Sequence, residues 1–489
     1  MAIFFLERGT ISVLINNETG LWWAYRSKND NHRSTVVCVD QAELLSQLID
    51  RAYLSSAEKM YAILLNYSIE KRPVDLRYLI LNVTSNCNLR CEYCYAKEQK
   101  KQAHMSYEVM SSAIENFYAA TEGAASRVIA FHGGEPLLHY GEILRVVDKF
   151  KCNRTHFLIQ TNGTLLSNDL IQELRLRDIE VGITVDSIDE KKTSLRSNED
   201  NYTQKVFYNL KKAAEMGVAQ SVLSIIQEGN VSDLISMTRV FNSLGISVVA
   251  YNLLWPTEVQ LLKHVVNNDQ LISASKDLYD YIQEKNYTEG FETFEKYRER
   301  NLYELWRRVF YARNDYMCMN APCGAGKAVV TVDETGDIYP CSLTLSISGV
   351  PILGNIKSEK IHQFSHQPER CLNHVEKCKN CPFKFTCGGG GCTGFIWKVT
   401  GDINGNSLYC NYYYEMIIFM MERAFEHANV NSLTNINFSS LTPINNITNK
   451  QLFPKENQWA TFNQRDYIST KFASQKRYFD KHSYRCECK

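Results

Sequence analysis

A repeated alternation of strand-like and helix-like segments constrains the fold of this chain most strongly, and it runs from residue 77 to residue 256. Six short apolar runs typical of buried strands alternate with segments in which apolar residues recur at helical spacing. The strand-like runs are LRYLILNVT, RVIAF, THFLIQTNG, EVGITVDS, SVLSIIQ and ISVVAYNLLW. Parallel strands need connections of about a dozen residues or more, and this spacing provides them. The sequence therefore predicts an α/β domain in which six parallel strands form a partial (β/α)6 version of the eight-stranded TIM-like barrel.

The loop after the first predicted strand reads CNLRCEYC and contains Cys87, Cys91 and Cys94. A tetrahedral zinc site and a four-iron cluster each need four ligands, so this loop lacks one. Three more segments, GGEP, TNG and TVDS, also follow predicted strands, although each alone is typical of a turn or a strand end. Functional residues of parallel barrels lie at the carboxyl ends of strands, so this shared position predicts one common site.

With these motifs, residues 80–256 resemble a radical S-adenosylmethionine (SAM) enzyme, whose hallmark is a CxxxCxΦC loop with an aromatic residue at Φ, here Tyr93. The resemblance implies that Cys87, Cys91 and Cys94 hold three irons of a [4Fe-4S] cluster and that SAM binds the fourth iron. It also implies that one electron cleaves SAM to a 5′-deoxyadenosyl radical, which takes a hydrogen atom from the substrate.

The same resemblance implies SAM contacts at the ends of the second and third strands. Gly133 and Gly134 match glycines that let the backbone approach the methionine amino group, and Glu135 helps to fix that end of SAM. Asn162 is a candidate for a nearby contact.

Further implied contacts follow the fourth strand. Thr184 and Asp186 match a Ser-x-Asp motif whose hydroxyl meets the ribose. Arg196 matches an arginine that pairs with the methionine carboxylate. Without the resemblance, Arg196 would be interpreted as a solvated surface residue.

A second cysteine-rich region includes the segments CGAGKAVVTVDETGDIYPC, in which DETG is typical of a hairpin turn, and CKNCPFKFTCGGGGC. It resembles the SPASM extension of radical SAM enzymes, which implies two auxiliary [4Fe-4S] clusters and three clusters in all. By that resemblance the first auxiliary cluster is held by Cys318, Cys323, Cys341 and Cys392, and the second by Cys378, Cys381, Cys387 and Cys410. The chain has four residues before Cys392 where the family pattern has three, and zinc is the alternative metal. Two fully ligated clusters would favour electron transfer over binding of a substrate thiol.

Five cysteines remain outside these three sets. Cys38 and Cys152 are expected to be small buried hydrophobic residues. Cys371 is an alternative to one of the auxiliary-cluster ligands, while Cys486 and Cys488 lie in the terminal RCECK segment, which we expect to be mobile.

Four further regions flank the barrel. Residues 1–76 are expected to form a small α+β domain, with a hairpin turned at ETG and helices over 41–53 and 55–67. This domain resembles winged-helix elements that bind the leader of a precursor peptide at a sheet edge; the alternative is a packing cap on the barrel. Residues 257–316 are expected to be a helical bridge, 317–410 the auxiliary-cluster domain, and 411–489 a helix followed by a polar, mobile tail.

Charge and hydropathy exclude several classes of protein. Lys plus Arg equals Asp plus Glu at 54 each, which argues against nucleic acid or a membrane surface as a partner. The apolar run at the start is too short for a signal peptide, and no apolar stretch reaches the roughly 20 residues that span a bilayer. We therefore expect a cytoplasmic protein, in which 16 cysteines favour metal binding over disulfides.

The combination of domains resembles maturases of ribosomally made peptides. It implies a precursor peptide as substrate, a small reductant such as flavodoxin or ferredoxin, and formation of an intramolecular C–C, C–O or thioether cross-link. The first alternative is formylglycine formation in a sulfatase, but that group carries an Asp after the cysteine that matches Cys341, and this chain has Ser342. Epimerisation and backbone excision are possible in the same architecture. A non-catalytic iron–sulfur scaffold is a different class, and the complete cysteine loop with Glu135 argues against it.

Overall fold

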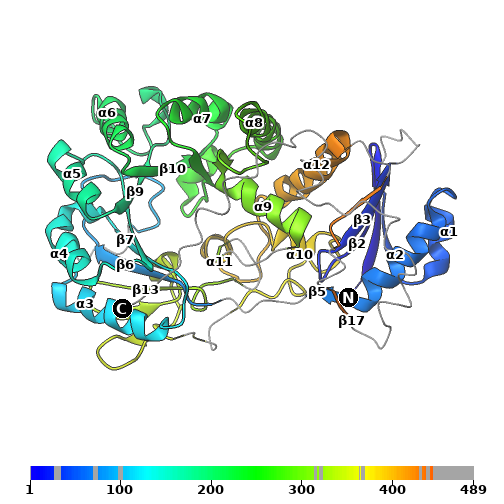
Figure 1. Cartoon of the computed structure of the whole chain (residues 1–489), viewed down its shortest axis with the longest axis horizontal. Helices are drawn as coiled ribbons and strands as arrows, with labels where there is room; N and C mark the ends of the chain where they lie inside the picture. Colours follow the sequence, from blue (N-terminus) through cyan, green and yellow to red (C-terminus); the bar gives the residue numbers. More distant parts are fainter. Residues whose placement is uncertain are drawn as a thin grey trace.

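The computed structural model describes residues 2–26, 35–69, 75–96, 103–312, 317–318, 323–362, 364, 369–428, 432–436 and 441–443. Cys486 and Cys488 lie outside the described residues. A curved sheet with helices on its outer side lies at the left of Figure 1, and a smaller sheet made largely from the N-terminal residues lies at the right.

The predicted partial barrel is confirmed. Six strands that are consecutive in the chain are also neighbours in the sheet, and each pairs in parallel with the next. They are β6 (Tyr78–Thr84), β7 (Arg127–Gly133), β8 (Thr155–Thr161), β9 (Ile179–Thr184), β10 (Ala219–Ile226) and β11 (Val248–Leu253). The connecting helices are α3 (Tyr107–Ala120), α4 (Tyr140–Phe150), α5 (Asn168–Leu176), α6 (Tyr202–Glu215) and α7 (Leu234–Ser243).

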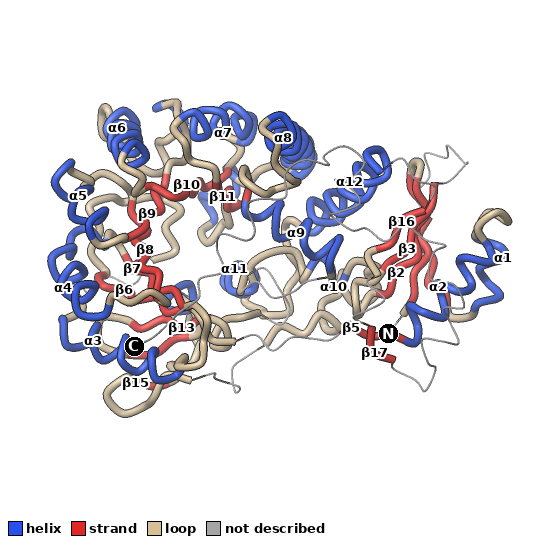
Figure 2. The backbone as a smooth tube through the Cα atoms, viewed as in Figure 1, coloured by secondary structure: helices blue, strands red, loops and turns tan. Residues whose placement is uncertain are grey.

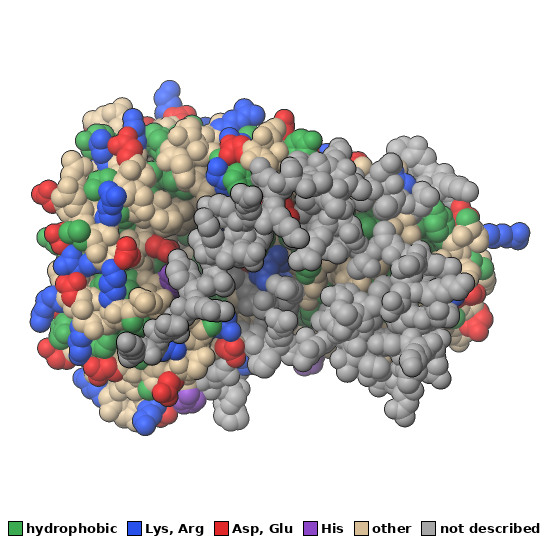
Figure 3. Space-filling model, in the orientation of Figure 1, with side chains coloured by type: hydrophobic (Ala, Val, Ile, Leu, Met, Phe, Trp, Pro, Cys, Tyr) green, Lys and Arg blue, Asp and Glu red, His purple; other side chains and the backbone are tan. Residues whose placement is uncertain are grey.

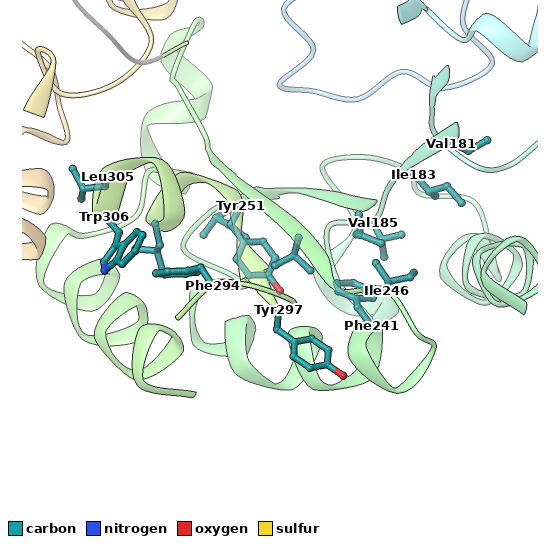
Figure 4. Packing of buried hydrophobic residues seen from close by; sticks show 14 of the residues in the cluster. Val181, Ile183, Val185, Phe241, Ile246, Tyr251, Phe294, Tyr297, Leu305 and Trp306 are labelled. Carbon is teal, nitrogen blue, oxygen red and sulfur yellow. The ribbon is translucent and has the colours of Figure 1, made fainter. Parts of the chain in front are cut away.

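Alternation along each strand divides the side chains between the helices and the inside of the curve. Val181 and Ile183 of β9 share one face with Val185, and all three are buried in the main hydrophobic core. Figure 4 shows these residues with Phe241 of α7 and Ile246, which belong to the same core. Burial of this face fixes the register of the sheet, because a shift by one residue would turn the apolar set toward the inside.

The sheet continues beyond the six predicted strands at both edges. On one side β12 (Arg298–Glu299) pairs with β11, and on the other β13 (Val329–Val332) pairs in parallel with β6. The hairpin predicted at DETG is confirmed, since β13 pairs antiparallel with β14 (Asp337–Tyr339), which pairs with β15 (Gly354–Asn355). The ten-stranded sheet therefore attaches the predicted auxiliary-cluster region directly to the barrel.

The N-terminal domain contains the expected hairpin. The domain comprises β1 (Ile3–Arg8), β2 (Ile11–Asn16), β3 (Trp22–Arg26), β4 (Thr35–Val39), α1 (Leu45–Leu48), α2 (Leu54–Asn66) and β5 (Tyr67–Ile69). The hairpin consists of β2 and β3. At the turn between β2 and β3, Asn16 Oδ1 accepts the N–H groups of Glu18 and Thr19 at 2.9 and 3.2 Å, and Gly20 adopts a φ of +70°.

The helix predicted over 41–53 is wrong beyond Leu48. A short 3-10 segment precedes α1, which ends where Ile49 takes an extended conformation and is buried in the N-terminal core. The Asp50 Oδ1 atom then accepts the Ala52 N–H at 3.0 Å, a local turn that competes with helix.

The prediction of a mobile tail is wrong for residues 432–436 and 441–443. After α12 (Cys410–Ala428), β16 (Ser432–Thr434) pairs with β3, and β17 (Leu441–Pro443) pairs with β5. Asn435 is buried and accepts the Trp22 N–H at 2.8 Å. Burial and hydrogen bonds to another part of the chain thus order a segment whose own composition is polar.

The range predicted to be a helical bridge contains α8 (Asn268–Thr288) and α9 (Arg300–Tyr311). The cysteine-rich region contains two short helices, α10 (Lys384–Cys387) and α11 (Thr393–Thr400) (Figure 2). No described helix is long and apolar enough to cross a bilayer. Positive and negative side chains are mixed over the barrel helices in Figure 3, in line with the balanced charge of the sequence.

Candidate functional site

The loop with Cys87, Cys91 and Cys94 begins directly after β6, at the carboxyl end of the barrel strands. The pKa of Cys91 is raised to about 11, mainly by burial and also by the nearby Cys94 and Cys87 thiols, while Arg196 acts to lower it. Cys91 thus lies in a desolvated position near the other two predicted thiols, and Cys87 is exposed.

Gly133 and Gly134 allow the end of β7 to approach this loop closely. The Gly134 N–H donates to Thr84 O at 2.7 Å, and the Glu135 N–H donates to Asn86 O at 2.8 Å. A Cβ at Gly133 would lie 2.2 Å from Thr84 O, and one at Gly134 would lie 2.1 Å from Asn86 O. In this structure the glycines therefore accommodate the backbone that leads into the cysteine loop.

Glu135 is fully buried and connects β7 to the end of β8. Its Oε1 accepts the Thr161 hydroxyl at 2.7 Å and the Leu137 N–H at 3.1 Å, and its Oε2 accepts the Asn162 N–H at 2.8 Å. Burial raises the pKa of Glu135, while these hydrogen bonds lower it. Glu135 is thus a structural link as well as a candidate SAM contact.

Asn162 connects β8 to the cysteine loop. Its Nδ2 donates to Asn88 Oδ1 at 2.9 Å, and its Oδ1 accepts the Thr164 N–H at 3.0 Å. The Nδ2 of Asn88, which lies next to Cys87 in sequence, donates to the Thr164 hydroxyl at 2.8 Å. Sequence reasoning missed Asn88, because a single Asn in a loop is typical of a turn.

Arg196 is buried in an ion pair. Its Nε lies 2.9 Å from Asp186 Oδ2 and its Nη2 lies 3.3 Å from Oδ1, a two-pronged contact. Tyr93 donates its hydroxyl to Asp186 Oδ2, and the Arg196 guanidinium lies 5.6 Å from the centre of the Tyr93 ring. The aromatic residue of the cysteine loop is therefore held by the same acid that orients the candidate SAM-binding arginine.

Thr184 accepts a hydrogen bond from Gln160 Nε2 at 3.0 Å, across the β8–β9 pair. Successive positions of these strands alternate between the two faces of the sheet, and Thr184 lies on the face opposite Ile183 of the core. Glu135 and Asn162 thus share one hydrogen-bonded group with the cysteine loop, while Thr184 with Gln160 forms a separate pair.

The structure also brings together both predicted auxiliary sets. The pKa of Cys318 is raised to about 12 by burial, the largest cause, and by the neighbouring Cys392 and Cys341 thiols. Burial and the Cys318, Cys341 and Cys392 thiols raise the pKa of Cys323. In the second set, burial raises the pKa of Cys387, as do Cys381, Cys378 and Cys410.

Thiol donors are ligands of both zinc and iron–sulfur clusters. Among the residues that the structure describes, no three His, Cys, Asp or Glu side chains are close enough to share a single metal ion. A single zinc ion needs its sulfur ligands about 2.3 Å from the metal, whereas a four-iron cluster binds each thiolate through a different iron. Each predicted set supplies four thiols, the ligand number that a four-iron cluster or a zinc ion requires.

Three cysteines outside the sets are exposed: Cys38, Cys152 and Cys371. The prediction that Cys38 and Cys152 are buried is wrong, because Cys38 lies on the solvent side of edge strand β4 and Cys152 lies in the turn after α4. The Cys371 N–H donates to Asn404 Oδ1 at 2.9 Å, and its thiol is exposed, unlike the buried Cys378.

Sequence reasoning missed Tyr95, which lies between two of the cysteine sets. Burial raises its pKa, a hydrogen bond with Ser342 lowers it, and the neighbouring thiols of Cys94, Cys341 and Cys392 raise it. Tyr95 therefore touches the segment after Cys341 while following Cys94 directly in sequence. Its place directly after Cys94 was the only sign in the sequence that Tyr95 belongs to the site. The tertiary structure is needed to identify Ser342 as its partner.

Comparisons with known proteins agree with this geometry. Residues 81–234 match the model of the radical SAM superfamily. A cysteine-type anaerobic sulfatase-maturating enzyme of Clostridium novyi is 23% identical over 355 residues, which cover 64% of this chain and 87% of that protein.

Two solved structures share the fold. The structure of anSMEcpe with bound AdoMet and Cp18Cys peptide aligns with a TM-score of 0.59 at 21% identity, covering 73% of this chain and 99% of that chain. Streptococcus suis SuiB bound to S-adenosylmethionine aligns with a TM-score of 0.53 at 14% identity, covering 83% of this chain and 98% of that chain. The present chain thus contains a radical SAM domain, and it has the fold of these enzymes.

Proposed function

We propose that this chain is a maturase that forms an intramolecular cross-link in a ribosomally made precursor peptide by radical SAM chemistry. Support for a peptide substrate comes from anSMEcpe, a structure of the same fold that was solved with a peptide and AdoMet bound. When bound, SAM and its cluster supply the radical that removes a hydrogen atom from the peptide. The residues of this chain bind and orient these groups.

Ser342 is the observation that favours cross-linking over formylglycine formation. By the resemblance described above, sulfatase maturases carry an Asp at this position, where a carboxylate can accept a proton. Here a hydroxyl occupies the position and interacts with the half-buried Tyr95. A serine is a poor proton acceptor near neutral pH, so this side of the site is suited to positioning a peptide rather than deprotonating it.

Each side chain proposed to contact SAM is itself held in position by a hydrogen bond or ion pair to another residue. Asp186 orients Arg196 for the methionine carboxylate, and Gln160 orients the hydroxyl of Thr184 for the ribose. Glu135 holds the end of β8 beside the cysteine loop, so that Asn162 stays in place. Side chains that are already held in position lose less conformational entropy when they bind their ligand, which favours a productive geometry.

The leader of the peptide is proposed to add to the N-terminal sheet at β4. In that sheet β16 pairs with β3, so the β3 edge already has a partner, whereas β4 is the last strand on the other side among the residues that the structure describes. An extended peptide could pair with β4 through main-chain hydrogen bonds. A small reductant such as flavodoxin or ferredoxin would supply the electron.

Co-expression tests the proposed reaction. The short open reading frame beside this gene would be expressed anaerobically with the wild-type enzyme and with Cys91→Ala, and the peptide masses compared. Loss of one hydrogen pair with the wild type alone, together with fragments missing across one segment, is the expected result. An unchanged mass in both samples would contradict cross-linking of this peptide.

Formylglycine formation is the second candidate, because the C. novyi relative is named as a sulfatase-maturating enzyme. The two reactions can be separated chemically. Formylglycine carries an aldehyde that a hydrazide reagent labels, and an intramolecular cross-link carries none. A sulfatase-motif peptide that becomes hydrazide-reactive only with the wild-type enzyme would therefore favour this second candidate.

A further inference from the structure

Three buried cations surround the second auxiliary set of cysteines. Arg308, Arg370 and Lys384 are 2%, 3% and 5% exposed, respectively, whereas long cationic side chains are mostly found at the surface. Lys384 pairs with the Glu18 carboxylate, and Glu304 acts electrostatically on Arg308. They come from separate segments: α9, the loop before α10, and α10 itself. Their convergence is a tertiary feature that no local motif encodes.

Each cation is adjacent to one or more thiols of this set. Arg370 acts electrostatically on Cys378 and Cys387, and Lys384 acts on Cys378 and Cys381. Arg308 donates from Nη1 to the backbone oxygen of Cys387 at 3.1 Å. Positive charge therefore reaches three of the four proposed ligands.

The guanidinium of Arg370 donates its hydrogen bonds to backbone carbonyls. Its Nη1 donates to Ile403 O at 2.7 Å, and its Nη2 donates to Gly405 O at 2.8 Å and to Gly389 O at 3.3 Å. Its Nε has no hydrogen-bond partner within the described part of the chain, and the Asp402 carboxylate acts on it less strongly than the thiols of this set. Carbonyl dipoles satisfy donors but do not neutralise a charge, and a poorly neutralised buried charge is costly. A four-thiolate cluster beside Arg370 would supply negative charge at short range.

The first auxiliary set has different surroundings. Two charged side chains of opposite sign, Arg300 and Glu304, act on Cys318. The main influences on Cys341 and Cys392 are burial, hydrogen bonds and, for Cys392, the neighbouring Cys341 thiol. Positive side chains therefore predominate around the second set, whereas charges of opposite sign act on the first.

We propose that Arg308, Arg370 and Lys384 form a buried cationic frame that makes the second auxiliary cluster easier to reduce than the first. The inference rests on the cluster assignment in the proposed function. A cluster gains one negative charge on reduction, and fixed positive charge in a low-dielectric site stabilises that reduced state. An electron shared between the two auxiliary sites would reside mainly on the second.

The test compares two lysines of one segment. Lys384 is buried, whereas the Lys379 side chain between Cys378 and Cys381 is 47% exposed and pairs with exposed Glu376. Lys384→Gln and Lys379→Gln would be made in the full chain with Cys91→Ala, so that the auxiliary signals dominate. Midpoint potentials would be measured by redox titration followed by electron paramagnetic resonance, alongside iron content.

We expect Lys384→Gln to lower the midpoint potential of one auxiliary cluster by about 59 mV. This shift corresponds to a tenfold change in the equilibrium constant of a one-electron reduction. Lys379→Gln should leave both potentials unchanged, because water screens its charge. Equal shifts in the two variants, or no shift in Lys384→Gln at full iron content, would overturn the proposal.

A second variant covers the case in which Lys384→Gln loses iron. Glu18 forms an ion pair with Lys384 at 2.5 Å, so Glu18→Gln removes the opposing charge while keeping the lysine. Its expected effect has the opposite sign, a higher potential for the same cluster, and a lower or unchanged potential would contradict the frame. The proposal also fails if Cys378→Ser retains the iron content of the parent. No peptide is involved, so failure to cross-link a peptide would leave these results standing.

Discussion

The Arg196 guanidinium holds the Asp186 carboxylate with Nε 2.9 Å from Oδ2, and both side chains are buried at the end of the barrel strands. Asp186 also accepts the Tyr93 hydroxyl and, at Oδ1, the Ile225 N–H at 2.9 Å. One carboxylate thus joins the cysteine loop, β10 and the arginine proposed to bind SAM. Substitution of Asp186 should therefore lower the free energy of unfolding and weaken SAM binding together.

Asp186→Asn should lower the free energy of unfolding by about 3 kcal/mol, because it leaves the buried Arg196 charge without its partner. SAM binding should weaken as well, since Arg196 loses its orientation. Urea unfolding followed by tryptophan fluorescence, and calorimetry with SAM, would measure the two effects. Glu142→Gln is the matched control: its partner Arg145 is 60% exposed, and the expected cost is below about 1 kcal/mol. Equal costs for the two variants would contradict the role of burial.

Gly134→Ala should destabilise the protein by about 1 to 3 kcal/mol and reduce the iron bound at the Cys87 loop, because its Cβ would lie 2.1 Å from Asn86 O. Iron analysis and thermal unfolding after anaerobic reconstitution would measure both changes. A Cβ at Gly141 in α4 would meet no heavy atom within 4 Å beyond its own helix, and Gly141→Ala should stabilise by up to about 1 kcal/mol. Full iron content in Gly134→Ala would show that the loop can move away.

His132 should make stability depend on pH, because burial lowers its pKa from 6.5 to about 4. The folded state favours the neutral imidazole, so the stabilisation is complete above pH 6.5 and is lost as the pH falls toward 4. The difference corresponds to about 3 kcal/mol. His132→Gln should flatten this part of the stability profile, measured by urea unfolding, while His156→Gln, whose imidazole is 57% exposed, should not. Parallel profiles for the wild type and His132→Gln would refute this assignment.

Asn435→Ala should loosen the N-terminal sheet, because Asn435 accepts the Trp22 N–H and donates from Nδ2 to both Gly20 O and Val309 O at 2.9 Å. Each buried group left without a partner costs about 1 to 3 kcal/mol. Hydrogen exchange should rise at β3 and β16 but not at β8 and β9 of the barrel. Unchanged protection of β3 would mean that the other contacts of β16 suffice.

Cys371→Ser should leave the iron content unchanged, whereas Cys378→Ser should remove the iron of one cluster. Cys371 is exposed, and Cys378 is buried beside two cations. Iron and sulfide analysis of the reconstituted proteins would distinguish them. A loss of iron in Cys371→Ser comparable to that in Cys378→Ser would move Cys371 into the second set.

The sequence by itself determined the barrel and the cysteine loop. Both are local in origin: apolar periodicity specifies strands and helices, and short connections make neighbours in the chain neighbours in the sheet. The spacing of Cys87, Cys91 and Cys94 within one loop likewise places three thiols together without help from distant residues.

Only the tertiary structure decided the features that join distant segments. The polar segment 432–434 becomes a strand because β3 offers an edge and Asn435 finds buried partners, neither of which its own composition reveals. Asp186 and Tyr93, like Tyr95 and Ser342, meet only after the strand ends come together. The cations around the second cysteine set arise in the same way, since long-range packing, rather than local pattern, determines which charges are buried side by side.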